Sequence, residues 1–234
     1  MNSIIWNGVP STAIQGLLIS DLPPITKPEM RIKETEIDGK DGSIIEELGY
    51  ASYQKTVKIG LYGSFDIDKV IKYFTGEGEL IFSNEPDKVY IAKICGKIDY
   101  TRLLRYRQAS IPFLVQPFKY KTGECYKETK ITDIVNGYFE VFNEGFENSK
   151  PLMVLKGSGT VEISLNGVGI FSYTFPDGEN EVIIDSEKED AYLENALKNR
   201  NMNGEFPILV PRTNKIEWSG DIESISVLPR SRWL

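Results

Sequence analysis

Carboxylates are the residues of this chain whose spacing most resembles catalytic chemistry. They occur as close pairs at Glu34/Glu36, Asp38/Asp41, Glu46/Glu47, Asp66/Asp68 and Glu189/Asp190. A carboxylate glycosidase needs one acid with a raised pKa and a second carboxylate facing it across a cleft. Pairs within one short segment do not provide that arrangement. We therefore interpret them as surface charges and expect no catalytic residue and no enzyme.

The chain has no histidine, which excludes Ser-His-Asp triads, Cys-His pairs and HExxH metal sites. Its two cysteines, Cys95 and Cys125, lack the spacing of a zinc motif. We expect two buried thiols that act as small apolar residues, with one disulfide as the alternative. The segment 38–42 lacks the alternating oxygen ligands of a calcium loop. We expect no metal and no cofactor.

Basic residues gather in one place, at Lys97, Arg102, Arg105 and Arg107. Such a run can lie over phosphates, but it is more typical of the solvated face of a strand or of an interface. Residues 1–130 carry 18 basic and 17 acidic side chains, whereas residues 131–234 carry 9 and 17. The acidic second part argues against a nucleic-acid footprint there.

The composition is that of a globular protein with two domains. The chain has 234 residues, of which 41% are hydrophobic and 26% charged, and its net charge is −7. The shift in charge and a polar segment near residue 120 predict domains at 1–130 and 131–234. We recognise no export signal and no apolar run long enough to span a membrane, and we expect a reducing cytoplasm.

Strands dominate the predicted elements. Alternating or β-rich stretches predict strands at 57–62, 90–94, 109–115, 138–142, 152–156, 160–165, 169–175, 181–184, 215–218 and 222–228. Asn-Gly and Asp-Gly pairs predict the turns between strands. One helix is predicted over 65–74, with Ser64 as its cap and Gly76 as its stop. Residues 186–199 fit either a short helix or part of a hairpin.

Two stretches of the chain carry motifs in a recognisable order. The first is Glu36-Ile37-Asp38-Gly39-Lys40-Asp41-Gly42, followed by Leu48-Gly49-Tyr50 and a strand from Lys55. The second runs from Val182-Ile183-Ile184-Asp185-Ser186-Glu187 through Asn214-Lys215-Ile216-Glu217-Trp218-Ser219-Gly220 to Pro229-Arg230-Ser231-Arg232-Trp233-Leu234. The order and spacing of these motifs resemble those of a known family, the siphophage distal tail (Dit) proteins. Arg212-Thr213 stands where the family usually has glycine, and Ser231 splits the terminal Pro-Arg-Trp-Arg pattern.

The resemblance implies a mainly β protein with two parts. The first is a β-barrel-like, tail-tube-like domain with one helix, and the second is a galectin-like antiparallel β-sandwich. It also implies that 186–199 belongs to a β-hairpin. Lectin activity does not follow, because lectins of that fold rely on a histidine that this chain lacks.

The implied function is structural. Six copies would form a ring joining the tail tube to the tail tip or baseplate, with DNA passing only through its channel and no membrane contact. Implied partners are the tail-tube protein, the tail-tip protein and a receptor-binding protein, in the virion after assembly in the host cytoplasm. The alternative is a monomeric carbohydrate-binding module or glycosidase.

We expect a hairpin arm from Glu36 to Leu61 that reaches a neighbouring copy by strand addition. Its expected interface residues are Asp38, Gly39, Asp41, Gly42, Tyr50 and Tyr53. Arg102, Arg105 and Arg107 would face either the channel or a subunit interface. Deleting residues 38–50 should leave a folded monomer that cannot close the ring.

Overall fold

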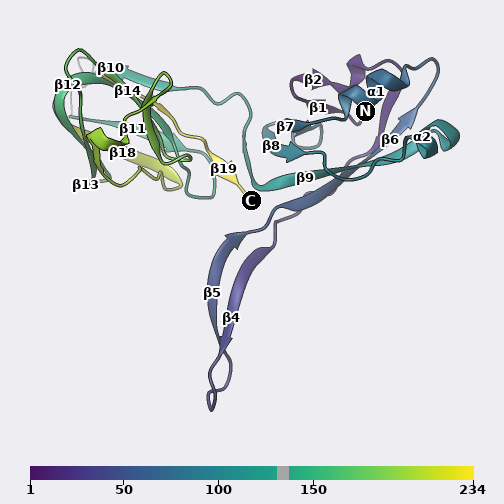
Figure 1. The fold of residues 1–234 in the computed structure, drawn as a ribbon, viewed down its shortest axis with the longest axis horizontal. Coiled ribbons are helices and arrows are strands. Elements are labelled where there is room, and N and C mark those ends of the chain that lie inside the picture. The colour runs from purple at the N-terminus through teal and green to yellow at the C-terminus, as the bar shows by residue number, and fades with distance from the viewer. Residues whose placement is uncertain (131–136) are drawn as a thin grey trace. The chain divides into compact units, whose positions relative to one another are not determined.

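The chain forms two compact units in a computed structural model that describes residues 1–130 and 137–234 (Figure 1). The first unit comprises residues 1–122 with Leu234, and the second comprises residues 123–233. Each unit has its own cluster of buried apolar side chains. The second unit begins before residue 130, because the strand Lys127–Lys130 pairs inside it. A boundary between residues 130 and 131 would separate that strand from its partner.

The first unit is a curled antiparallel sheet with two short helices. Its elements are β1 (Ile4–Trp6), β2 (Val9–Pro10), β3 (Leu17–Asp21), β4 (Met30–Glu36), β5 (Ser43–Tyr50), β6 (Tyr53–Leu61), α1 (Ile67–Tyr73), β7 (Glu77–Phe82), β8 (Lys88–Lys93), α2 (Tyr100–Tyr106) and β9 (Gln108–Lys121), with a 3-10 turn at Ser11–Ala13. The main path runs β2-β1-β7-β8-β9-β6-β3, while β4 and β5 form a separate two-stranded sheet. Period-two alternation in β6 buries Val57 and Ile59 and exposes Lys58.

The predicted helix exists but is shorter than the sequence indicated. Asp66, not Ser64, is its N-cap, because the Asp66 carboxylate accepts hydrogen bonds from the backbone N–H groups of Asp68 and Lys69. Val70, Tyr73 and Phe74 are buried, whereas Ile71 is exposed.

Two expectations from the sequence are wrong. The first unit has a second helix, α2, where the sequence suggested the solvated face of a strand, while an interface role for this basic run stays a prediction. Asp99 caps α2 by accepting a hydrogen bond from the backbone N–H of Arg102, and a short segment with mixed propensity forms a helix because of this local bond and of burial of Leu103. Cys95 and Cys125 are free and exposed, so the expectation of buried thiols is also wrong.

The second unit is built from antiparallel strands. They are β10 (Lys127–Lys130), β11 (Tyr138–Asn143), β12 (Leu152–Leu165), β13 (Val168–Thr174), β14 (Glu181–Asp185), β15 (Asp190–Leu193), β16 (Ala196–Leu197), β17 (Met202–Gly204) and β18 (Arg212–Leu228), with a 3-10 turn at Asn199–Asn201. The short strand β19 (Arg232–Trp233) follows near the end of the chain and is not part of this sheet. The strands β15 and β16 pair with each other, so 186–199 contains a hairpin as the resemblance implied.

Two long strands, β12 and β18, tie this unit together. The sequence predicted a break in each, at about 157–159 and 219–221, but both strands run through with shifts in register. The first part of β12 pairs with β14 and its second part with β13, while β18 pairs along both parts. Glycines mark the irregularities, and Gly220 has a φ of 90°. The breaks are therefore bends within continuous strands.

The fold class predicted from the sequence, mainly β, is confirmed, whereas the galectin-like label stays a prediction. The predicted turns at Asn7-Gly8 and Asn166-Gly167 have positive φ at both residues, as hairpin turns of this kind require. Among the described residues, no helix is long and apolar enough to cross a membrane.

Candidate assembly surfaces

The strands β4 and β5 form an arm, residues 30–50, which projects from the first unit (Figure 1). Apart from the half-buried Met30 and Tyr50, every residue of the two strands is exposed. The side chains include Ile44 and Ile45, which are 50% and 58% exposed. A two-stranded hairpin in water is at best marginally stable on its own. The arm therefore exposes apolar side chains to water, and packing against another surface would bury them.

The strand register gives the arm two faces of different chemistry. Residues directly opposite each other lie on the same side of an antiparallel pair. One side, which we call the acidic face, consists of Ile32 opposite Glu47, Glu34 opposite Ile45 and Glu36 opposite Ser43. It holds three carboxylates and no cation.

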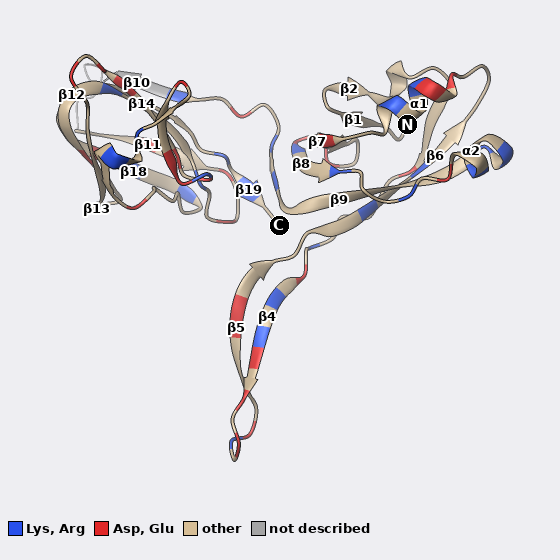
Figure 2. Ribbon diagram, viewed as in Figure 1, with Lys and Arg blue, Asp and Glu red and all other residues tan. Residues whose placement is uncertain are grey.

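The other side, which we call the mixed face, carries charges of both signs. Lys33 Nζ lies 3.2 Å from Glu46 Oε2, and Arg31 donates a hydrogen bond to the carbonyl oxygen of Leu48 at 2.8 Å. Figure 2 shows Lys or Arg together with Asp or Glu on the two strands of the arm.

The structure separates the residues predicted for the arm into two groups. Asp38, Gly39, Asp41 and Gly42 lie in the loop at the tip, where both glycines have positive φ. Tyr50 and Tyr53 lie at the base. The arm was predicted to run from Glu36 to Leu61, but β6 pairs with β3 and β9 and so belongs to the main sheet.

Aromatic and basic side chains support the base of the arm. The rings of Tyr50 and Phe118 meet edge to face, with centroids 6.0 Å apart, and Lys27 Nζ lies 5.5 Å from the Tyr50 ring centroid. Tyr53 is half-buried, and burial with the nearby charge of Glu85 raises its pKa to about 12. These contacts bind both ends of the arm to the first unit.

A buried group of charges beneath the base was not predicted. Lys55 is 2% exposed and donates a hydrogen bond to the carbonyl oxygen of Pro24 at 2.8 Å, in the segment that leads into β4. Beside it, Lys119 Nζ lies 2.7 Å from Glu85 Oε1, and Glu85 also accepts a hydrogen bond from the hydroxyl of Tyr90. Burial lowers the pKa of Lys55, an effect that the Glu85 carboxylate opposes.

The strand alternation could have revealed Lys55. It occupies the same side of β6 as Val57 and Ile59, which are fully buried. A lysine in that register is either buried or at the end of the core, and here it is buried because Pro24 supplies an acceptor.

The predicted basic residues lie on or next to α2. Leu103 is buried, while Arg102, Arg105 and Arg107 are exposed. Arg107 ends the helix in the left-handed region, and its guanidinium lies 4.5 Å from the Phe65 ring centroid. An open hollow of about 600 Å³ lies against the helix, lined by Asp99, Thr101, Arg102, Arg105, Tyr106 and Gln108. Figure 2 shows Lys or Arg, and no Asp or Glu, along α2.

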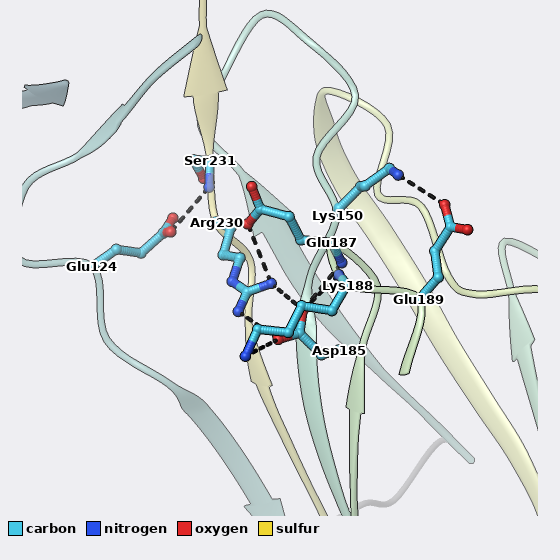
Figure 3. Close-up of polar contacts among 8 residues, drawn as sticks. All are labelled: Glu124, Lys150, Asp185, Glu187, Lys188, Glu189, Arg230 and Ser231. Atoms are coloured by element: carbon cyan, nitrogen blue, oxygen red, sulfur yellow. Dashed lines mark hydrogen bonds and ion pairs between the residues drawn. The ribbon is translucent and has the colours of Figure 1, made fainter. Parts of the chain in front are cut away.

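In the second unit, two segments of the sequence resemblance meet (Figure 3). Arg230 donates two hydrogen bonds to the carboxylate of Asp185, at 2.6 and 3.2 Å. The Asp185 side chain is 1% exposed. Burial alone would raise the pKa of Asp185, but the hydrogen bonds and charge of Arg230, with backbone N–H groups of Lys188 and Glu187, hold that pKa below its usual value. The pair joins the end of β14 to the last residues of the chain.

The departure at Ser231 has a structural role. Ser231 is fully buried, its backbone N–H donates to the Glu124 carboxylate at 2.9 Å, and its hydroxyl accepts from the backbone N–H of Glu144 at 3.0 Å. Figure 3 shows Glu124 beside Ser231. The Ser231 hydroxyl thus ties this position to Glu144, while its backbone N–H, which any residue except proline would supply, ties it to Glu124.

The departure at Arg212 is also accommodated. Arg212 has a φ of 79°, a region that favours glycine. The buried Asn214 side chain donates hydrogen bonds to the carbonyl oxygens of Val210 and Arg212 and accepts one from the Val210 N–H. This turn keeps the shape that a glycine would allow because Asn214 holds it.

Comparison with known proteins places these features in context. Residues 14–115 match the family model described as a phage tail protein RIFT-related domain. A search of curated proteins gave no match.

Solved structures match over nearly the full chain. The Dit protein of SPP1, described as a paradigm of the hub adsorption apparatus in phages that infect Gram-positive hosts, is 14% identical, covers 97% of each chain and has a TM-score of 0.72. A chain from the phage p2 baseplate in its activated conformation with Sr is 9% identical, with coverage of 96% and 97% and a TM-score of 0.52. A chain from the same baseplate with Ca is 8% identical, covers 97% of each chain and has a TM-score of 0.52. At these identities the likeness establishes the fold.

Proposed function

We propose that this chain, which has the fold of a siphophage distal tail protein and a phage tail RIFT-related domain at residues 14–115, is a structural component of a phage tail. In this proposal six copies form a ring at the distal end of the tail tube. The ring joins the tube to the tail tip or baseplate and leaves a channel for DNA. The protein would assemble in the host cytoplasm and reside in the virion.

The exposed arm is the observation that supports the proposed ring. A closed ring of identical chains uses heterologous contacts, in which one surface of each copy meets a different surface of the next. The arm supplies one such surface, because its two strands pair only with each other in the described part of the chain and expose aliphatic side chains. Covering those side chains on the next copy would favour assembly.

The mass of the protein in solution tests the proposal. Six chains of 26.5 kDa would weigh about 159 kDa. We expect light scattering to give that mass in a concentration-dependent manner, and negative-stain microscopy to show rings. Antibody labelling of virions should place the protein at the tail tip. A chain that stays at 26.5 kDa at every concentration and binds glycans would instead favour a carbohydrate-binding module or glycosidase.

A variant without the arm tests the role of that element. The structure changes the design, because deleting residues 38–50 would remove β5 and leave β4 unpaired. We expect replacement of residues 31–49 by a short Gly-Ser linker to abolish the ring and preserve the melting temperature. The control replaces only the tip, residues 38–42, and keeps both strands. A normal ring from the armless variant would contradict the role of the arm.

The proposed partners are the tail-tube protein, the tail-tip protein and a receptor-binding protein. Co-expression followed by affinity purification should recover the first two with the assembled ring. Recovery of neither from the intact ring would contradict the proposed position in the tail.

A further inference from the structure

We propose that the acidic face of the arm of one copy packs on α2 of the neighbouring copy. This inference rests on the proposed ring and adds to it the receiving surface and the side of the arm that meets it. The occupant of the surface at α2 is therefore a second copy of this chain.

The acidic face has the chemistry of a specific docking surface. Glu34, Glu36 and Glu47 surround Ile32 and Ile45, which are 46% and 58% exposed. None of these carboxylates has an opposite charge on its own side of the hairpin. The mixed face does not share this property, because Lys33 pairs with Glu46 there.

The surface at α2 is complementary to it. Arg102 and Arg105 lie one turn apart and line the open hollow, with Asp99 as the one acidic residue of that lining. Leu104 and Tyr106 are exposed apolar neighbours of these arginines. Arginine pairs well with carboxylates through its planar fork of donors, and a rim of opposite charges around apolar contacts favours one partner and one register.

Both surfaces are exposed within a single copy, so each is available to another copy. From base to tip, each side of the arm has about ten residues. At about 3.3 Å per residue, the arm reaches roughly 33 Å. That length is sufficient to cross a subunit boundary. A contact of this kind would also place the arginines at an interface rather than at the DNA channel.

Charge reversal tests the contact. We expect Glu34→Lys with Glu47→Lys to weaken ring formation roughly tenfold or more, because like charges would face Arg102 and Arg105. Arg102→Glu with Arg105→Glu should weaken it equally, and the four changes together should restore the ring. The matched control is Glu46→Lys, which has the same charge change on the mixed face and should have a smaller effect than Glu34→Lys.

Cross-linking locates the contact independently. In a background with Cys95→Ser and Cys125→Ser, one chain carries Ile45→Cys and another carries Leu104→Cys. We expect a short bifunctional maleimide to link the two mixed chains, and a chain with Val168→Cys, exposed in the second unit, to link to neither.

The outcomes separate the two proposals. Rings that form normally despite both reversals, or that link elsewhere, would overturn this inference and leave the proposed ring intact. Arginine variants that keep the ring but lose affinity for DNA would assign α2 to the channel and also overturn it. A wild-type protein that remains monomeric throughout would contradict the proposed function itself.

Discussion

At the scale of single residues, the pair Asp185–Arg230 is the best-defined polar contact of the second unit. Two segments that are separated by 45 positions meet through a bidentate contact, and the Asp185 carboxylate is almost wholly buried. A second ion pair from Arg230 to Glu187, at 3.4 Å, supports the same corner. A buried charge is costly unless it is paired, so both residues must be present together.

Removing the charge of Asp185 should therefore destabilise the second unit. We expect Asp185→Asn to lower the free energy of unfolding by about 3 kcal/mol, because it leaves Arg230 without its main partner. Chemical denaturation would measure the change. The control is Glu189→Gln, whose exposed pair with Lys150 should contribute less than about 1 kcal/mol. Equal losses in the two variants would contradict the argument.

The Asp185 carboxylate also makes the stability of the second unit depend on pH. The pKa of Asp185 is lower in the folded chain than its usual 3.8. The contribution of Asp185 to the free energy of unfolding is therefore present at a pH above 3.8 and is lost as the pH falls through the lowered pKa. We expect acid to destabilise the wild-type second unit more steeply than the Asp185→Asn variant below about pH 4. Parallel curves of stability against pH would contradict this.

At the scale of elements, α1 shows how a local bond sets where a helix begins. Both Ser64 and Asp66 are residue types that cap helices, but only Asp66 accepts the backbone N–H groups of the first turn. We expect Asp66→Ala to lower the melting temperature by a few degrees and Ser64→Ala to leave it nearly unchanged. Calorimetry of the two variants checks this, and the reverse order would restore the original assignment of the cap.

The bends of the long strands depend on close backbone approach. A Cβ at Gly157 would lie 2.3 Å from the carbonyl oxygen of Asp221, whereas a Cβ at Gly169 would meet nothing within 4 Å. We expect Gly157→Ala to destabilise the second unit by about 1–3 kcal/mol and Gly169→Ala to have little effect. Urea unfolding followed by circular dichroism would measure both, and equally small effects would show that the bend tolerates a side chain.

These elements show how much of the fold could be predicted from the sequence. Alternation in β6 and the Asn-Gly turns are local properties, so strands and turns could be predicted from residue types alone. The merging of two predicted segments into β12 depends on pairing with β14, β13 and β18, which are far away in the sequence. The helix α2 depends on the burial of Leu103, which no local pattern reveals.

The candidate surfaces likewise combine features that residue types predict with features that only the folded chain reveals. The tip residues Asp38, Gly39, Asp41 and Gly42 were found because Asp-Gly pairs predict turns. The burial of Lys55 was missed although the alternation of β6 could have revealed it. Its acceptor Pro24 is far away in sequence, and only the folded base of the arm brings the two together. Separating the acidic face from the mixed face required the register of β4 against β5.

At the scale of the whole molecule, two separate cores imply two cooperative transitions. The cluster around Val57 and Phe113 lies in the first unit, and the cluster around Leu155 and Ile225 lies in the second. Domains with their own cores generally unfold as units. We expect calorimetry of the full chain to resolve two transitions, and Asp185→Asn to shift only one of them. A shift of both by the same amount would contradict independent folding.

The exposed arm has a consequence for the chain before it assembles. Newly made protein presents an uncovered hairpin with open strand edges and aliphatic side chains, which is the kind of surface that seeds fibrous aggregation. Six charged residues, Arg31, Lys33, Glu34, Glu36, Glu46 and Glu47, lie among those side chains along the two strands. Charges at such positions act as gatekeepers that keep identical edges from stacking on one another. The carboxylates proposed to select a neighbouring copy would thus also oppose edge-to-edge association of hairpins before assembly.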